Sequence, residues 1–231
     1  MAGGVALTAT DTERDPAVLG VTEERADLSQ RRTGSRWAPG AGWDRAEDLG
    51  ATEEPGDLFV TPTGGPSAPG TERAPLDLAT ALAGGRVKPG QTVWVGGGTY
   101  RGCFVSKVAG KAALPVVIRQ RPGERAVIDG RGCTQPGTLM VKGADVWFWG
   151  LEVMSSDPER VTTTPGSNPD DLDRPAGVFV QAPRTKFINM VVHDNGNGFA
   201  FWKQAVDSEI YGAVIYNNGW IGPDRGHGHG V

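Results

Sequence analysis

Residues 177–219 contain two copies of one sequence pattern, and this repeat constrains the fold more than any other feature of the chain. Gly177 aligns with Gly198 and, to within one residue, Phe187 aligns with Glu209. Each copy holds three apolar patches that are too short for helices and are separated by polar breaks. A repeat of about 21 residues with three strands is typical of one coil of a parallel β-helix. The sequence therefore predicts an all-β solenoid.

The same three-patch pattern precedes the repeat, at residues 138–141, 146–148 and 151–154. Two longer segments, 155–176 and 219–229, each follow the third patch of a coil. Both therefore leave the solenoid at the same corner, before the first strand of the next coil. Insertions in repeat proteins tend to collect on the binding face. We expect these two excursions to form the walls of a binding site.

The composition agrees with a turn-rich solenoid, because the chain has 35 glycines and 17 prolines. Its net charge of −4 argues against a nucleic-acid partner. The first residues lack the pattern of a signal peptide, and no apolar run is long enough to cross a membrane. We therefore expect neither a nucleic acid nor a membrane as a partner.

The chain divides by composition into a leader and a folded domain. Residues 1–56 are charged, rich in Gly and Pro and without period, which predicts a disordered leader. Residues 57–231 carry the β-helix pattern. Within them, residues 75–83 begin with proline, place apolar residues on one side and end before two glycines, which predicts a short helix. Such a helix can cover the open end of the coil.

The two cysteines, Cys103 and Cys133, are spaced so that they could lie on neighbouring coils. Whether two cysteines pair depends on a geometry that the sequence does not supply. Both outcomes stay open, and two buried thiols are the expectation that we favour.

Two segments resemble the entry of right-handed parallel β-helix proteins of the pectate-lyase-like superfamily. They are residues 87–100, with VWVGGGTY, and residues 115–130, with PGERAVIDG. The resemblance covers about residues 57–231 and is specific for the fold but not for an activity. It implies an extracellular, polysaccharide-directed protein, a class that includes lyases, hydrolases, epimerases and surface binders. In the catalytic members, the substrate lies along the first-strand sheet, in a groove walled by loops at the corner described above.

The strand register predicts which side chains line this groove. A tryptophan beside a cation suits a uronate, because the indole stacks on the sugar and the ammonium pairs with the carboxylate. The alternative is that Trp202 only covers the outside of the coil under a loop. The outward residues are Met140, Lys142, Phe179, Gln181, Ala200 and Trp202, with Lys203 at the edge.

The first excursion is rich in carboxylates. Calcium requires hard oxygen ligands, and many of the resembling lyases use a bound calcium to acidify the C5 proton of a uronate. The commoner outcome for such a cluster is a solvated acidic loop. The candidate calcium ligands are Asp170, Asp171 and Asp173.

The run from Asp224 to Gly230 alternates glycine with polar residues and is the most unusual part of the chain. His227 or His229 could act as a base near neutral pH, and Arg225 could neutralise a carboxylate. The two histidines could instead share a metal, or the run could simply turn the chain into the next coil.

The function that we expect is lyase-like cleavage of a uronate-containing polysaccharide by β-elimination. The expected catalytic residues are His227, His229, Lys203 and Arg225, and the expected substrate-binding residues are Trp202, Gln181, Lys142 and Phe179. The alternatives are a non-catalytic carbohydrate-binding or adhesion module and a structural spacer. Val231 lies at the start of a new strand, so we expect further coils or an associating chain at that end.

Overall fold

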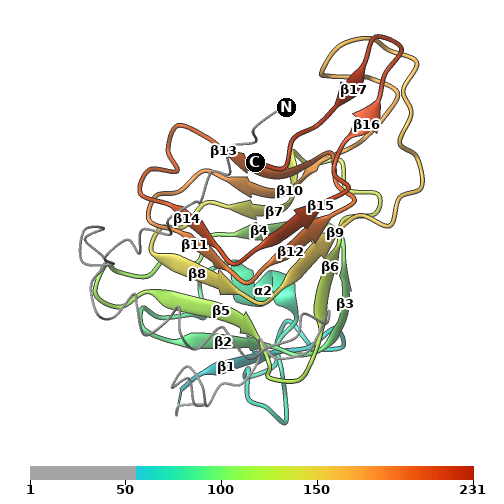
Figure 1. The fold of residues 1–231 in the computed structure, drawn as a ribbon. Helices are drawn as coiled ribbons and strands as arrows, with labels where there is room; N and C mark the ends of the chain where they lie inside the picture. The colour runs from blue at the N-terminus through green and yellow to red at the C-terminus, as the bar shows by residue number, and fades with distance from the viewer. Residues whose placement is uncertain (1–55) are drawn as a thin grey trace, which may run out of the picture. The chain divides into compact units, whose positions relative to one another are not determined.

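The computed structural model describes residues 56–231, so the predicted leader lies outside the described residues except for Gly56. Apart from one two-stranded antiparallel hairpin, the strands of the described part form three parallel sheets, and each complete coil contributes one strand to each of them (Figure 1). This arrangement is a parallel β-helix, as the repeat predicts. The chain therefore has the right-handed solenoid fold that its motifs indicate.

The first sheet has the order β13-β10-β7-β4, and its outward face is the predicted groove. Its strands are β4 (Phe104–Ser106), β7 (Gly137–Val141), β10 (Ala176–Val180) and β13 (Asn197–Phe201).

The second sheet has the order β1-β2-β5-β8-β11-β14. Its strands are β1 (Leu58–Val60), β2 (Thr92–Val95), β5 (Val116–Gln120), β8 (Val146–Trp149), β11 (Lys186–Ile188) and β14 (Glu209–Tyr211).

The third sheet has the order β15-β12-β9-β6-β3. Its strands are β3 (Gly98–Arg101), β6 (Ala126–Asp129), β9 (Glu152–Met154), β12 (Val191–His193) and β15 (Val214–Tyr216).

The register of the first sheet follows the sequence repeat, since Val178 pairs with Phe199. The second sheet is shifted by two residues relative to the first, and Phe187 pairs with Ile210, which lies within one residue of the aligned Glu209 as expected. The shift arises in the turn between the first two strands, which comprises residues 181–185 in one coil and the longer segment 202–208 in the next. Apolar side chains remain on the core side in both coils.

Stacked aromatic rings connect successive coils inside the solenoid. The ring of Phe187 lies parallel to that of Phe148, with 5.5 Å between the centroids, and meets Phe199 edge-on at 5.2 Å. All three are buried with Leu139 and Val178 in one continuous core. Strands at equivalent positions of successive coils stack directly on one another. Apolar side chains of one coil therefore contact apolar side chains of the next along the coil axis.

A short helix, α2 (Leu78–Leu82), packs against β1 and β4, which confirms the helix expected within residues 75–83. Asp77 caps it, because its side chain accepts a hydrogen bond from the backbone N–H of Thr80. Its apolar residues, Leu78, Ala81 and Leu82, are buried in the core.

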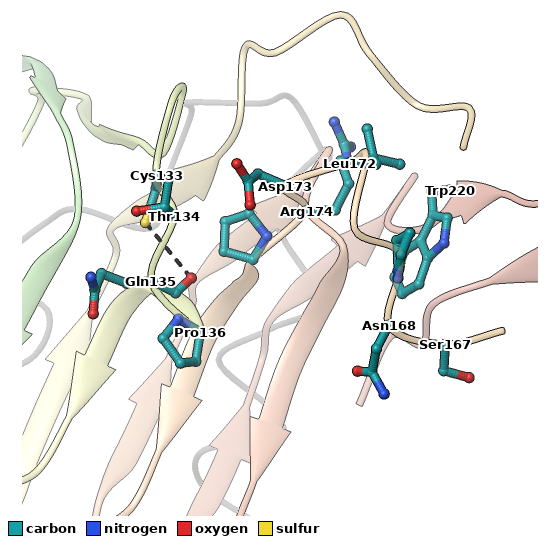
Figure 2. Close-up of a pocket in the computed structure, with 12 residues that line it drawn as sticks. Cys133, Thr134, Gln135, Pro136, Ser167, Asn168, Leu172, Asp173, Arg174 and Trp220 are labelled. Atoms are coloured by element: carbon teal, nitrogen blue, oxygen red, sulfur yellow. Dashed lines mark hydrogen bonds between the residues drawn. The ribbon is translucent and has the colours of Figure 1, made fainter. Parts of the chain in front are cut away.

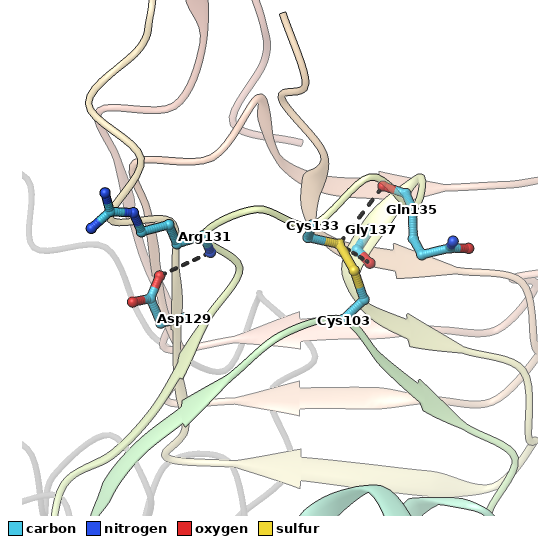
Figure 3. Close-up of a disulfide and its surroundings, with 6 residues drawn as sticks. All are labelled: Cys103, Asp129, Arg131, Cys133, Gln135 and Gly137. Atoms are coloured by element: carbon cyan, nitrogen blue, oxygen red, sulfur yellow. Dashed lines mark hydrogen bonds between the residues drawn. A yellow bond between two sulfur atoms is a disulfide. The ribbon is translucent and has the colours of Figure 1, made fainter.

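Cys103 and Cys133 form a disulfide, with 5.4 Å between their Cα atoms (Figure 3). Cys103 lies between β3 and β4, and Cys133 lies one coil later, between β6 and β7. The expectation of neighbouring coils is confirmed, and the favoured expectation of two buried thiols is wrong. Stacking of the coils brings together two side chains that are 30 residues apart.

Candidate functional site

Three segments meet at the corner where the chain passes from the third sheet to the first. They are the short loop 130–136 and the two excursions, and the excursions extend together away from the sheets (Figure 1). Val161 forms a parallel bridge with Ile221, and the side chain of Asp224 accepts a hydrogen bond from the N–H of Gly166 at 3.3 Å. The two excursions therefore share one corner and contact each other.

A pocket of about 280 Å³ opens between these segments. Figure 2 shows the loop before β7 on one side of it and Trp220 on the other, with Asp173 and Arg174 between them. It is lined by Cys133, Thr134, Gln135, Pro136, Ser167, Asn168, Pro169, Leu172, Asp173, Arg174, Pro175 and Trp220.

The second excursion contains a small antiparallel hairpin, β16 (Trp220–Ile221) with β17 (Gly226–His227). The imidazole of His227 stacks on the indole of Trp220 with 5.2 Å between the ring centroids. Its Nε2 lies 3.0 Å from Oδ1 of Asp224, and this hydrogen bond lowers the pKa of that carboxyl group. Only 3% of the His227 side chain is exposed, so the ring holds the hairpin together.

The other polar residues of this excursion are more open. Arg225 is exposed and pairs with Asp224 at 3.3 Å. His229 is exposed, and its backbone N–H donates to Oδ1 of Asn197 at the start of β13. Lys203 is also exposed but lies beyond the opposite end of β13. The structure thus places His229 and Lys203 at opposite margins of the first sheet.

One column of side chains follows the ends of the first-sheet strands. Backbone hydrogen bonds continue the parallel register past the strands, from the N–H of Lys142 to Ser106 and from the N–H of Trp202 to Val180. The column therefore contains one residue per coil, at intervals of about 4.8 Å. Its members are Lys107, Lys142, Gln181 and Trp202.

The column is cationic at one end and aromatic at the other. Lys107 and Lys142 are exposed, and neither forms an ion pair with another residue in the range 56–231. The Trp202 side chain is 54% exposed and lies against Phe179, with 5.4 Å between the ring centroids. Lys107 is absent from the predicted set, although its position after β4 matches that of Lys142 after β7.

The predicted outward residues differ in exposure. Phe179, Gln181 and Ala200 are half-buried, whereas Met140 is buried although it lies on the same face. Met140 pairs with Phe179 across β7 and β10, so the middle of the face is apolar and the ends of the strands are polar.

The carboxylates of the first excursion bind their own loop. Asp171 accepts hydrogen bonds from the hydroxyls of Thr162 and Thr163, which lower its pKa to about 2. Asp170 accepts one from the hydroxyl of Thr164 at 2.7 Å. Asp173 lies in the pocket wall.

Calcium was expected at these carboxylates. Within residues 56–231, no group of three or more His, Cys, Asp or Glu side chains is placed to hold a metal ion. Asp170 and Asp171 already accept hydrogen bonds, so the set does not form a ready calcium cage, and no catalytic step is assigned to calcium. Calcium binding therefore stays a prediction.

A charged cluster at β12 is a feature that sequence reasoning did not predict. Nε2 of His193 lies 2.9 Å from Glu152, and its Nδ1 lies 2.5 Å from Asp194. Glu152 also receives two hydrogen bonds of 2.6 Å from Arg125. Burial opposes protonation of His193, but its hydrogen bonds to both carboxylates outweigh burial and raise its pKa.

The parallel β-helix fold of this chain is shared by several solved structures. A lacto-N-biosidase from Eubacterium ramulus superposes with a TM-score of 0.54 and 15% identity over 72% of this chain and 35% of its own. A rhamnogalacturonan lyase superposes with a TM-score of 0.52 and 14% identity over 70% of this chain and 52% of its own. An alginate lyase from a Paenibacillus species gives a TM-score of 0.48 and 24% identity over 60% of this chain and 41% of its own.

The chain thus spans between about a third and a half of the length of these solved structures. No protein-family model and no curated protein matches the sequence. In residues 56–231, no helix is both long and apolar enough to cross a membrane.

Proposed function

We propose that this protein acts outside the cell on an acidic polysaccharide, which it binds along the outward face of the first sheet and cleaves by β-elimination. The observation that supports this most is the column Lys107, Lys142, Gln181 and Trp202. Its two lysines lack ion pairs within residues 56–231, and the exposed indole lies two coils from Lys142. Ammonium groups suit uronate carboxylates, and an open indole suits the C–H face of a sugar.

The chemistry of β-elimination requires two functions from the protein. A lysine or arginine neutralises the uronate carboxylate, and this makes the C5 proton acidic enough for a base to remove. The electrons of the C5–H bond then form the C4–C5 double bond, and the C4–O bond breaks with its electron pair staying on the leaving oxygen, which takes a proton from the protonated base or from water. We assign the carboxylate to Lys142 and Lys107, and the base to Lys203, which is exposed at the same end of the strands. His229 is exposed at the opposite margin, so it can act as the base only for a uronate whose carboxylate lies at the strand beginnings.

His227 and Arg225 take different parts in this proposal. The buried imidazole of His227 holds the hairpin, so it shapes the wall of the groove. Arg225 lies exposed on the same hairpin and is a second candidate for the substrate carboxylate. The proposal therefore keeps the predicted residues but gives His227 a positioning role.

The test is an ultraviolet assay for unsaturated products on a panel of uronate polysaccharides, with and without calcium. We expect Trp202→Ala to weaken substrate binding by about 1–2 kcal/mol, roughly a tenfold rise in Kd or KM. The matched control is Trp147→Ala, which removes an indole from the outward face of the second sheet, where Lys186 lies over the ring at 5.4 Å. Equal effects of the two substitutions would contradict the assignment of the groove.

A non-catalytic binding module is the second candidate, and the burial of His227 favours it. With that imidazole 3% exposed, the described residues contain fewer open bases than the sequence suggested. Binding that depends on Trp202, without any unsaturated product, would identify the module. A product signal that is lost in Lys203→Ala or His229→Ala would identify the lyase and its base.

A further inference from the structure

The pocket at the loop corner has the size of a site for one small ring. Its volume of about 280 Å³ lies just below the range of about 300–1,000 Å³ that is usual for drug-sized ligands. Pro136 and Pro175 line it and immediately precede β7 and β10. It therefore lies at the beginning of the first-sheet strands, roughly 15–20 Å from the column at their ends.

The lining of the pocket combines apolar surfaces with uncommitted polar groups. Leu172, Trp220 and three prolines supply the apolar part. The side chains of Thr134, Asn168 and Asp173 have no hydrogen bond to any residue in the range 56–231. A sugar ring presents C–H faces and hydroxyl groups together, so this lining suits a saccharide.

The charges in the pocket disfavour an acidic ligand. The guanidinium of Arg174 donates through its Nη atoms to the carbonyl oxygens of Asp157, Glu159 and Asp194 at 2.8–3.3 Å, and its Nε has no partner in residues 56–231 but is buried away from solvent. Arg225 reaches Ser167 at the rim but is not among the residues that line the pocket. Asp173 adds an exposed carboxylate that would repel a uronate but can accept hydrogen bonds from hydroxyl groups.

We propose that this pocket binds a neutral sugar unit, carried as a branch by the acidic polysaccharide that lies along the first sheet. The inference rests on the proposed function and names its substrate class: an acidic backbone with neutral branches. The backbone follows the column from coil to coil. The branch runs across the strands toward the pocket.

The test compares two preparations of one acidic polysaccharide, with its neutral branches intact and with the branches removed enzymatically. We expect the branched form to bind about tenfold more tightly. Raising the salt concentration should weaken the binding of both forms, because it screens the lysine column, and should leave the tenfold ratio unchanged.

Leu172→Trp fills the pocket and Asn168→Ala removes a polar group from it. We expect Leu172→Trp to abolish the preference for the branched form and Asn168→Ala to reduce it, both without changing the affinity for the debranched form. The matched control is Val161→Trp, which adds an indole to an exposed position of the same excursion that does not line the pocket. It should retain the preference.

Equal binding of the two forms by the unmodified protein, or equal loss of both in Leu172→Trp, would overturn the proposal. If neither form binds, the proposed function fails, and the pocket is then tested alone by saturation-transfer NMR. The probes are methyl glycosides of galactose, mannose and xylose, with methyl galacturonate as the acidic comparison. A signal from a neutral glycoside that disappears in Leu172→Trp supports the pocket, and its absence overturns it.

Discussion

His193 is held between two carboxylates while it stacks on Tyr216, with 4.7 Å between the ring centroids. The same cluster reaches the first excursion, because Arg160 pairs with Asp194 at 3.0 Å and Arg174 donates to the carbonyl oxygen of Asp194. The charge of one imidazole therefore contributes to the attachment of a groove wall. This role depends on pH.

The raised pKa of His193 predicts how stability varies with pH. Protonated His193 stabilises the folded state fully below its ordinary pKa of about 6.5, and this contribution is lost as the pH rises through the raised folded-state value. We expect the free energy of unfolding to fall more steeply as the pH rises above about 6.5 than it does in His193→Gln. Urea denaturation at a series of pH values measures this.

His229→Gln is the control, because that side chain is exposed and outside the cluster. Its pH profile should parallel that of the unmodified protein. A His193→Gln profile with the same slope as the unmodified protein would show that the imidazole does not titrate in this range.

At the scale of elements, the corner loops are held by contacts that differ from those within the sheets. The β16–β17 hairpin depends on the Trp220–His227 stack, and the loop 130–136 depends on the disulfide. The sulfur of Cys133 also lies 3.7 Å from the carbonyl oxygen of Gly137, at the first residue of β7 (Figure 3). The pocket thus lies between two segments with independent anchors.

Replacing both cysteines by serine should loosen one side of the pocket. A disulfide that spans 30 residues stabilises a protein by about 3–4 kcal/mol in the chain-entropy account. We expect a loss of this size in urea denaturation, with faster exchange of the amide hydrogens of Thr134, Gln135 and Gly137. The unmodified protein in reductant should behave as the variant does, and unchanged exchange in both samples would contradict this role.

At the scale of the whole described solenoid, stability comes from apolar contacts that recur at equivalent positions between coils. Phe187 touches a ring in the coil before it and rings in the coil after it. Stability in such repeat folds is close to a sum of neighbour interactions. One core ring therefore affects two coil interfaces.

Phe187→Ala should lower the free energy of unfolding by about 3–5 kcal/mol, because it leaves a cavity in a core where this ring is fully buried. Urea denaturation measures the loss, and amide exchange should rise in β8 and β14 on both sides of β11. Trp147→Ala, on the outward face of β8, is the control and should cost about 1 kcal/mol or less. Similar losses in the two variants would contradict a core built on the stacked rings.

The sequence by itself determined the coil, the first-sheet register and the corner at which the excursions leave, because a strand that repeats each turn leaves a periodic trace. It also placed Trp202 and Lys142 on one face, since alternation decides the side of a strand. It placed the partner of Phe187 only to within one residue, because turn length changes without disturbing the apolar pattern.

Only the tertiary structure decided the features that do not follow the sequence repeat. The disulfide, the burial of His227 and the pairing of His193 with Glu152 each join residues whose separation in sequence carries no signal. The same holds for the pocket, which forms only where three non-repeating segments meet. The repeated pattern makes the β-helix scaffold predictable from the sequence. The site depends on contacts between loops, and the repeat does not specify these contacts.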